Sequence, residues 1–446
     1  MGFAVLVHDD ASAEPSARAS RTPWRSPFVG RAAELTYVAS ALADGERMIS
    51  ILGPPGVGKS RLAREALSRA RDAGRRAIEI DGSFAEDAAE LRDALLVAAS
   101  KEGCSELHAL ARLGPAVVLV DGLDDAAGFA AEELERWLAA APELALLAPS
   151  RVRLRCAGEL VVDLGPLEPE LCVEVFAGKA RRAIPSFALR EEERRLVAEL
   201  SRRLDGLPLA VELAAESARS FAPADLLERM NVDVLLDPRG GTARSPLRDA
   251  IRSSFDRLTP AARGALTALA TGPSPLTLAA AEARVRVAGV TAPAYVIEEL
   301  VDASLMRVEA GEEPRYTLLE SIRRFALTYG DGADRPREVQ SAETGAVIAR
   351  SGQWFVSPSG ERVSLAASPK LAAVLAALVR ARLDGRDTLD TSAIVAEGWP
   401  GELILPRAAR NRVYVAVSSL RRMGLQSAVH HTRTGYRLDD DVVLAE

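Results

Sequence analysis

The sequence contains no long apolar run. No stretch approaches the ~18 uninterrupted apolar residues of a membrane-spanning helix. Residues 3–7 are apolar, but Asp9 and Asp10 follow at once and no basic residue precedes them, so this segment does not fit a signal peptide. We therefore expect a cytoplasmic protein that makes no membrane contact.

Cysteine is scarce as well. The chain has three cysteines, Cys104, Cys156 and Cys172, and they are widely spaced. An odd number at such spacing fits neither a disulfide framework nor a zinc site. We expect these residues to be reduced, buried thiols.

Acidic residues are nearly absent from one part of the chain. The protein has 446 residues and a formal net charge of −7, which disfavours a nucleic-acid partner for the molecule as a whole. From Gly401 to Arg437, however, seven arginines accompany a single acidic residue, Glu402. Distant charge is screened within ~8–10 Å, so this local positive charge is the relevant signal for DNA.

The length of the chain implies several domains of ~100–200 residues each. Short apolar runs alternate with helical patterns from residue 28 to 165, which predicts a parallel sheet covered by helices. The runs are Met48–Leu52, Ala77–Ile80, Ala116–Val120 and Leu144–Ala148. Helical patterns fill 166–245 and most of 246–330, which ends in two strand-like pieces, Leu305–Glu309 and Arg315–Leu319. No repeat of fixed period occurs, which disfavours a solenoid.

Residues 53–60 read Gly-Pro-Pro-Gly-Val-Gly-Lys-Ser and match G-x-x-x-x-G-K-[ST] at every fixed position. They follow the first apolar run and open a predicted helix that ends near Ala73, which is the context of a P-loop. The glycines let backbone N–H groups surround phosphates, Lys59 reaches the β- and γ-phosphates, and Ser60 ligates Mg²⁺. A plain Gly/Pro-rich turn is the alternative, and the complete match disfavours it. The residues predicted to hold ATP here are Gly53, Gly56, Val57, Gly58, Lys59, Ser60 and Arg61.

Acidic residues complete the predicted site. The run Ala116–Val120 delivers Asp121 at a strand end, where its carboxylate can hold the magnesium shell. Asp124 is the candidate for orienting the attacking water, but the usual residue in such ATPases is Glu, and Asp is one methylene shorter. We therefore expect slow hydrolysis. The alternative is that Asp124 and Asp125 only cap the next helix.

Four motifs, in order, resemble the NB-ARC type of STAND signal-transduction ATPases over residues 26–330. They are Phe28-Val-Gly-Arg-Ala-Ala-Glu-Leu35, Leu147-Ala-Pro-Ser-Arg151, Leu204-Asp-Gly-Leu-Pro-Leu-Ala-Val-Glu-Leu213, and Leu247–Ala270 with Leu300-Val-Asp-Ala-Ser-Leu305. The resemblance implies that Val29, Gly30 and Arg31 lie against the adenine. It also implies that Arg151 senses the γ-phosphate, that Pro208 touches the base, and that a winged-helix domain completes the ATPase lobe.

The chain departs from that family in two respects. Many members carry Met-His-Asp where this chain has Leu318-Leu-Glu320, so the histidine that would contact the β-phosphate in the ADP-bound form is absent. The chain therefore lacks that means of locking a resting state. No repeat array follows the winged helix, where this family usually keeps its ligand sensor.

From residue 341 onward the pattern changes to hairpins and shorter helices. Hairpins are predicted at Gln353–Leu365 and His430–Leu438. One helix is predicted to start with Ser368 as its N-cap and Pro369 in its first turn, and others over Ala393–Glu397 and over Pro406–Met423. The last helix buries Val413, Ala416, Val417 and Leu420 at helical spacing, which leaves its opposite face polar and rich in arginine.

This order of elements, ending in Thr434-Gly-Tyr-Arg437, resembles the OmpR-type winged-helix DNA-binding domain. The resemblance implies that the third helix enters the major groove and that the wing reaches an adjacent groove. Arginines can reach guanine or phosphate, and Val415 can touch a thymine methyl. The predicted DNA contacts are Arg410, Asn411, Arg412, Val415, Ser418, Ser419, Arg422, Arg433 and Arg437. The alternative is an arginine-coated helix that contacts protein.

Together these features predict a multidomain chain. It comprises a mobile segment (1–25), an α/β P-loop nucleotide-binding domain with a parallel sheet (26–165), an α-helical domain (166–245), a winged-helix domain (246–335) and a C-terminal α+β winged helix-turn-helix (341–446). The expected function is an ATP-switched transcriptional regulator that binds ATP or ADP with Mg²⁺, self-associates on activation and reads duplex DNA. Two rivals stay open: a nucleotide-driven oligomeric scaffold whose C-terminal module binds protein, and an ATPase motor on nucleic acid.

Overall fold

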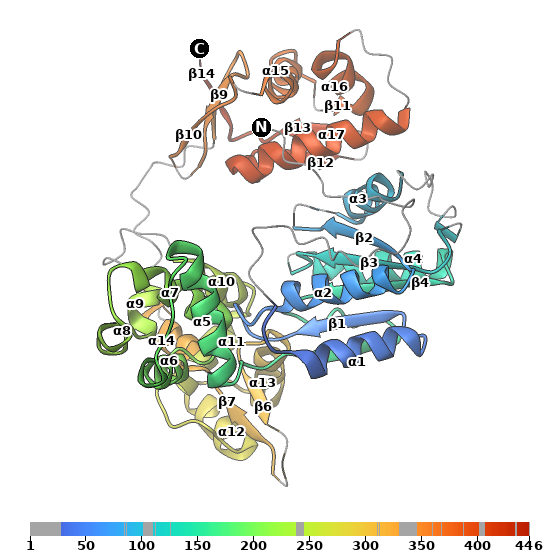
Figure 1. Ribbon diagram of the computed structural model, residues 1–446. Coiled ribbons are helices and arrows are strands. Elements are labelled where there is room, and N and C mark those ends of the chain that lie inside the picture. Colours follow the sequence, from blue (N-terminus) through green and yellow to red (C-terminus); the bar gives the residue numbers. More distant parts are fainter. Residues whose placement is uncertain are drawn as a thin grey trace.

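The computed structural model describes most of the chain (Figure 1). The described residues are 28–83, 85, 87–100, 110–111, 113–124, 126–237, 245–309, 311, 313–329, 346–358, 360–366, 368–386, 388–400, 406–432 and 435–445. The predicted mobile segment 1–25, Cys104, Asp125 and Arg433 lie outside them. Within the described residues, no helix combines the length and the apolar character needed to cross a membrane.

A five-stranded parallel sheet forms the first part of the molecule. Its strands are β1 (Met48–Leu52), β2 (Arg76–Asp81), β3 (Ala116–Asp121), β4 (Leu144–Pro149) and β5 (Glu159–Asp163), in the order β2-β3-β4-β1-β5. Every neighbouring pair is parallel. The four predicted apolar runs are all strands, so the parallel-sheet prediction is confirmed. The sequence does not predict β5, because its apolar run, Leu160-Val-Val162, is short and its first residues are only partly buried.

Helices cover both faces of this sheet, which explains why its central strands are apolar without alternation. β1 and β4 are buried along their whole length. In β3, Val117 and Leu119 belong to one core, whereas Val118 and Val120 belong to the other. α1 (Ala32–Ala43) and α2 (Lys59–Asp72) pack into the first core, and α3 (Ala88–Ser100) and α4 (Ala127–Ala140) pack into the second.

The second part of the molecule is mainly helical, as the sequence predicts. Its elements are α5 (Pro169–Ala183), α6 (Glu191–Arg203), α7 (Pro208–Glu216), the 3-10 turn η2 (Ser217–Arg219), α8 (Pro223–Arg229), α9 (Val232–Leu236), α10 (Pro246–Phe255), α11 (Pro260–Ala270), α12 (Leu278–Val287), α13 (Pro293–Asp302), β6 (Arg307–Glu309), β7 (Arg315–Thr317) and α14 (Glu320–Tyr329). β6 and β7 form an antiparallel pair. These helices share one continuous core with the α1 and α2 face of the sheet.

The C-terminal module, which we define as residues 346–445, has a core of its own. β8 (Val347–Ala349), β9 (Trp354–Val356), β10 (Arg362–Ser364) and β14 (Val443–Ala445) form one sheet, and β11 (Leu389–Asp390), β12 (Val429–Thr432) and β13 (Gly435–Leu438) form another. The helices are α15 (Pro369–Leu383), α16 (Thr391–Gly398) and α17 (Pro406–Leu420), which continues into the π-type turn η3 (Arg421–Leu425). The predicted hairpins and helices are present, and α17 buries the four expected apolar residues.

Two details of this module differ from the sequence prediction. Ser368 is the N-cap residue of α15, as predicted, but its side chain makes no capping hydrogen bond. Pro369 in the first turn suits a helix start without that cap. The sequence does not predict β8 and β14, which pair in parallel from opposite ends of the module. Strands of three residues are too short to carry a clear alternation.

The two described cysteines agree with the expectation of buried thiols. Cys156 and Cys172 are buried and form no disulfide. Burial raises the pKa of Cys156 to about 12 and that of Cys172 to about 11. Burial therefore favours the protonated form of both thiols at neutral pH.

Candidate nucleotide-binding site

The P-loop connects β1 to α2 and takes a shape that favours glycine at three positions. The φ angles of Gly53, Gly56 and Gly58 are 146°, 80° and 100°. A Cβ on Gly53 would lie 2.4 Å from the carbonyl oxygen of Leu164, and one on Gly56 would lie 2.9 Å from the Cβ of Leu209. Gly58 precedes the first turn of α2, which no side chain caps. The backbone N–H groups of this helix start therefore suit an anion.

Lys59 begins α2 and folds back over the loop. Its Nζ donates hydrogen bonds to the carbonyl oxygens of Gly53 and Pro54, at 2.8 and 3.2 Å. Burial, and to a smaller extent the charge of Arg151, lowers the pKa of Lys59 to about 8, although nearby carboxylates, Asp124 above all, oppose the shift. A phosphate partner would favour the charged form again. The surroundings of Lys59 therefore fit an anionic ligand.

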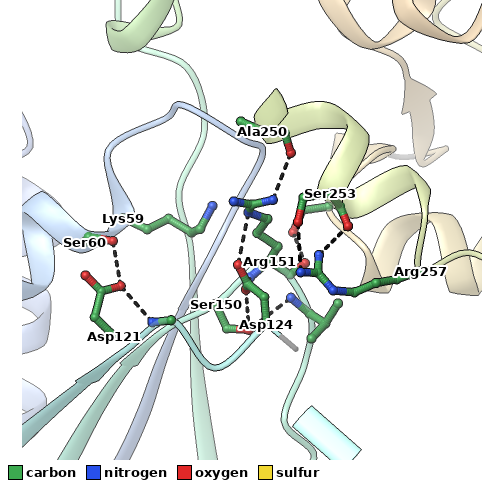
Figure 2. Close-up of polar contacts among 12 residues, drawn as sticks. Lys59, Ser60, Asp121, Asp124, Ser150, Arg151, Ala250, Ser253 and Arg257 are labelled. Atoms are coloured by element: carbon green, nitrogen blue, oxygen red, sulfur yellow. Dashed lines mark hydrogen bonds and ion pairs between the residues drawn. The ribbon is translucent and has the colours of Figure 1, made fainter. Parts of the chain in front are cut away.

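Ser60 and Asp121 meet at the carboxyl end of the sheet (Figure 2). Ser60 Oγ donates to Asp121 Oδ1 at 2.9 Å, and the N–H of Gly122 donates to the same oxygen at 3.1 Å. Arg64 of α2 contacts the other carboxylate oxygen at 2.6 Å, and burial raises the pKa of Asp121 against these donors. A hydroxyl and a carboxylate at this separation are the oxygen ligands that Mg²⁺ takes beside nucleotide phosphates. The residues present therefore fit Mg²⁺.

Asp124 lies beyond β3 and binds the segment that follows β4. Its Oδ1 accepts hydrogen bonds from the N–H of Arg151 at 2.7 Å and from Ser150 Oγ at 3.3 Å. Its Oδ2 lies 3.1 Å from Arg151 Nε. The alternative that Asp124 caps the next helix is wrong, because the N-cap of α4 is Ala126. Asp124 instead positions Arg151.

Arg151 joins the sheet to the helical part of the molecule. Its Nη1 donates to the carbonyl oxygen of Ala250 in α10 at 2.8 Å, and Ser304 Oγ donates to the Arg151 carbonyl at 2.8 Å. Arg155 pairs with Asp302, the last residue of α13, at 2.6 Å. Figure 2 shows the Arg151 side chain between Asp124 and Ala250, on the side of the site toward which Lys59 points. A residue at the phosphate end of the site thus also contacts α10.

A pocket opens beside the P-loop, where the first part of the chain meets α5 and α7. Three motifs of the sequence line it together: the Val-Gly-Arg segment, the P-loop and the proline that begins α7. The lining residues are Phe28, Val29, Arg31, Val57, Gly58, Arg61, Leu167, Glu174, Val175, Gly178, Pro208 and Glu212. Six of these residues have apolar side chains and four are charged, a mixture that suits an organic ligand with a few polar groups.

Gly30 and Arg31 shape one wall of this pocket. Gly30 has a φ of 69°, and a Cβ there would lie 2.9 Å from Leu171 Cδ1. Arg31 also has a positive φ, 62°. Its guanidinium pairs with Glu34 at 2.9 Å and donates to the carbonyl oxygen of Gly165. The Val-Gly-Arg segment is therefore fixed against the segment that leads into α5.

The sequence does not predict the helical wall beyond Pro208. Arg61 lies 3.6 Å from Glu212 of α7, and the N–H of Leu209 donates to the carbonyl oxygen of Gly56 at 3.2 Å. α7 is thereby tied to the P-loop. Glu212 and the α5 residues of the wall lie in ordinary amphipathic helices, whose pattern does not mark which residue faces a ligand.

Asp205 is another residue that the sequence does not single out. It has a φ of 58° and lies just before α7. Its carboxylate oxygens accept from the N–H groups of Glu320 and Ser321 at 2.8 and 2.7 Å, so it caps the start of α14, and burial raises its pKa. The segment that replaces Met-His-Asp is thus linked to the segment that carries Pro208. From the sequence, the pair Asp205-Gly206 indicates only a turn.

Only some of the predicted DNA contacts are described. The side chains of Arg410, Asn411 and Arg422, and all of Arg433, lie outside the described part of the chain. The Arg412 guanidinium lies 5.8 Å from the centre of the Trp399 ring. Arg437 lies 3.5 Å from Asp440 at the end of β13. Both described arginines thus have a neighbour within the C-terminal module.

The middle of α17 departs from the predicted outward face. Ser419 Oγ donates to the carbonyl oxygen of Val415 at 2.7 Å, which keeps that hydroxyl on its own helix. Ser418 is only 8% exposed. α3 of the first part of the chain packs against α17. Ser418 is therefore largely covered in this arrangement, and its contact with DNA stays a prediction.

The part of the chain that contains the P-loop is similar to a known protein family. Residues 27–175 match the family model of the AAA ATPase domain. The chain therefore carries an ATPase domain of the P-loop NTPase class. The match ends within α5, so it includes the sheet, the P-loop and Arg151.

Two relatives come from Mycobacterium tuberculosis. One, whose name describes it as a candidate HTH-type transcriptional regulator, is 30% identical over 309 residues, which are 64% of this chain and 34% of that protein. The chain thus spans about a third of the length of this relative. The other, named as uncharacterized, is 29% identical over 363 residues, which are 74% of this chain and 86% of that protein.

Among solved structures, the ORC2 protein of Aeropyrum pernix, in ADPNP–ADP complexes, is similar with a TM-score of 0.41 and 16% sequence identity. The similar region covers 68% of this chain and 93% of the ORC2 chain.

Proposed function

We propose that this chain is an ATP-switched transcriptional regulator. In this proposal an NB-ARC-like lobe binds ATP with Mg²⁺, hydrolyses it slowly and controls a C-terminal winged helix that reads duplex DNA. The observation that carries the proposal is the pocket shared by Val29, Arg31, the P-loop and Pro208. These residues come from separate segments that the sequence singles out independently, and a chance set of motif matches would not bring them to one pocket.

Lys59, Ser60 and Asp121 would hold the triphosphate and its metal. The bound Mg²⁺ would neutralise charge on the β- and γ-phosphates. Lys59 would exchange its contacts with the loop carbonyls for phosphate oxygens, and Val29, Arg31 and Pro208 would hold the base. Arg151 would respond to the γ-phosphate. Since Arg151 also binds Ala250 in α10, a change at the γ-phosphate would reach the helical part of the molecule.

Slow hydrolysis follows from the contacts of Asp124. Both of its carboxylate oxygens are engaged, one by the N–H of Arg151 and the other by the Arg151 guanidinium. A carboxylate held in this way is poorly placed to orient a water molecule. The site therefore suits a switch that keeps its nucleotide for a long time rather than a motor that turns over quickly.

The C-terminal module would read DNA as an OmpR-type winged helix. Its α15, α16 and α17 precede the β12–β13 hairpin, which is the order of a three-helix reader with a wing. Arg412 lies on α17, Arg422 lies in the η3 turn that continues it, and Arg437 lies in β13. Arg433 falls between β12 and β13 in the sequence. The name of the M. tuberculosis relative points the same way. Self-association on ATP binding would pair two readers on two half-sites.

Selection from a random duplex library with purified full-length protein tests this proposal. We expect enrichment of one sequence family, with a different yield when ATP and Mg²⁺ are present. Lys59→Ala protein should lose the dependence on ATP but keep the enriched sequence. A pool that stays random under all conditions would contradict the DNA-reading part of the proposal.

The scaffold is the second candidate, and one observation favours it. α17 is packed against α3, so the module makes a protein contact through the helix assigned to DNA. If the module served protein contacts alone, the library would yield nothing, while ATP would still drive assembly in light scattering. Both candidates share the nucleotide site, so sequence-specific DNA binding is the measurement that separates them.

A further inference from the structure

The C-terminal module packs on the ATPase domain through α17 and α3, which lie side by side (Figure 1). At the centre of this contact, Arg421 Nη1 donates to both carboxylate oxygens of Glu90, each at 2.9 Å. The two residues are 331 positions apart in the sequence. Each of the two side chains is only 1% exposed. A buried ion pair therefore joins the module to the domain.

Two further contacts lie beside this pair. His431 of β12 places its Nδ1 3.1 Å from Asp87 Oδ2, just before α3. Tyr414, seven residues before Arg421 on α17, places its hydroxyl 3.4 Å from the carbonyl oxygen of Asp81 at the end of β2. The contacts thus run from the end of β2 to the first turn of α3. They involve both α17 and the predicted wing.

The chemistry of the ion pair suits a contact that opens and closes. Removing a charge from water is unfavourable unless a partner replaces the lost hydration, and Glu90 and Arg421 replace it for each other. Arg421 Nε also donates to the carbonyl oxygen of Val429 at 2.9 Å, which fixes the guanidinium within its own module. If the module moved away, water could hydrate both charges. Removing one partner while the module stays docked would leave a buried charge without its counterpart, which disfavours the docked arrangement.

The docking site adjoins the proposed magnesium ligand. Asp81 and Asp121 are partners in the register of β2 and β3. The N–H of Gly82 donates to the carbonyl oxygen of Asp121 at 2.7 Å. A Cβ on Gly122 would lie 2.0 Å from Ser83 Oγ, so the segment after β2 packs closely on the segment after β3. A shift at Asp121 would therefore reach the segment that holds Tyr414.

We propose that the start of α3, residues 87–90, is a docking site for the C-terminal module and that the docked module is barred from duplex DNA. The major groove must admit the recognition helix itself. α17 cannot enter it while the helix packs against α3 and Tyr414 contacts the end of β2. The bar on DNA rests on the proposed function, whereas the docking does not. In this proposal, nucleotide bound near Asp121 changes the equilibrium between the docked and the released form of the module.

Glu90→Gln in the full-length protein tests the docking. The variant removes the negative charge that Arg421 needs, so the module should be released. Suppose that in the wild type the docked form outnumbers the released form by ~10-fold or more. Release should then raise the rate of hydrogen exchange by at least that factor at the amides of α17 and of the start of α3. Binding to a mixed-sequence duplex at low salt should tighten by the same factor. Glu132→Gln on exposed α4 is the matched control and should change neither quantity.

A second variant guards against a folding defect. Asp87→Asn keeps the oxygen that accepts from the N–H of Glu90 at 2.8 Å but removes the charge beside His431. It should produce the same changes as Glu90→Gln, in the same direction and smaller. Both variants should still bind ATP saturably, which shows that the ATPase domain remains folded.

The outcomes separate the two proposals. If exchange rises in both variants and DNA binding tightens, docking and its bar on DNA are supported. If exchange rises but neither the variants nor the wild type bind any duplex, docking stands and the DNA-reading function fails. If exchange at α17 and α3 and the affinity for the duplex both match the wild type, the docking proposal is overturned.

Discussion

The nucleotide site and the contact between α3 and α17 are both built from charged side chains, but their partners come from different distances along the chain. Lys59 binds the carbonyl oxygens of Gly53 and Pro54, six and five residues away. Arg421 binds Glu90, 331 residues away. The first set of contacts is encoded in one motif. The second exists only after separate parts of the chain have come together.

This difference determines how each region should respond to substitution. In the nucleotide site, the charge of Lys59 is directed at a ligand, so its loss should remove binding and leave the fold. At the α3 contact, each charge serves the other part of the protein, so its loss should change an equilibrium between arrangements. Substitutions at increasing distance from the phosphate end of the site probe this contrast, and the largest effects are expected nearest to it.

Lys59→Ala should weaken ATP binding by at least ~100-fold, which is about 2.7 kcal/mol. The ammonium head contacts only carbonyl oxygens of its own loop, so its loss leaves the cores of the protein intact. Isothermal titration with ATP and Mg²⁺ measures the affinity, and thermal unfolding without nucleotide is the control. An unchanged dissociation constant would overturn the assignment of the phosphate site.

Asp121→Asn should separate binding from hydrolysis. The carboxylate acts through the metal, so we expect the variant to keep ATP within ~10-fold of the wild-type affinity while losing Mg²⁺-dependent phosphate release. Ser60 can still donate to the amide oxygen, which preserves the local hydrogen bond. Single-turnover phosphate release and nucleotide titration give the two readouts. An equal loss of both would mean that Asp121 holds the loop rather than the metal.

The sequence predicts the P-loop better than the rest of the molecule because the geometry of this loop is local. The P-loop is one continuous segment, and glycine at 53, 56 and 58 reports backbone angles directly. The roles of Asp205 and Glu90 could not be predicted from the sequence, because their partners are distant in the chain. The partners of Asp205 are backbone N–H groups of α14, and the partner of Glu90 is a side chain of η3, so neither pairing leaves a pattern in the neighbouring residues.

The fold shows the same division. Buried strands such as β1 and β4 are readable from uninterrupted apolar runs, because both of their faces are covered. β5 is for the most part only partly buried, and β8 has just three residues, so neither carries a clear apolar run. The burial of Ser418 could not be predicted for a related reason. Helical periodicity correctly separates the core of the module from its opposite face, but it does not tell whether another domain covers that face.

Asp205→Ala tests the cap that links the Pro208 segment to α14. Loss of the cap should cost ~1 kcal/mol, and alanine in the left-handed conformation, φ 58°, adds ~1–2 kcal/mol. Asp205→Asn is the matched control, since asparagine tolerates this backbone conformation and retains one acceptor. Urea unfolding measures the free energy of unfolding of each variant. Equal free energies of unfolding for Asp205→Ala and the wild type would mean that this cap does not stabilise the protein.

The pKa of Lys59 predicts how ATP binding depends on pH. Its folded value of about 8 lies below the ordinary 10.5. Between these values the unfolded chain binds more protons than the folded one, so stability without nucleotide should rise with pH in this window. ATP needs the charged ammonium, so affinity should fall by up to ~10-fold for each pH unit above 8. Titrations from pH 7 to 9.5 check this expectation, and Lys59→Arg, whose charge persists, should flatten the profile.

The smallest expected effects separate positioning from reading in the C-terminal module. If about five arginine–phosphate contacts form, log K for duplex binding should fall with log salt at a slope of about −4 to −5. Arg433→Ala should weaken all sequences evenly and reduce the magnitude of that slope by about one. Arg422→Ala on the helix should instead relax the preference at one base position, by ~1–3 kcal/mol for a bidentate guanine contact. Both variants are best measured in the Glu90→Gln background, where the module should be released from α3 and the docking equilibrium no longer obscures changes of a few fold. If both variants keep the salt slope and the base preference of the Glu90→Gln parent, Arg422 and Arg433 have no role in DNA binding. The main role of this surface would then be its contact with α3.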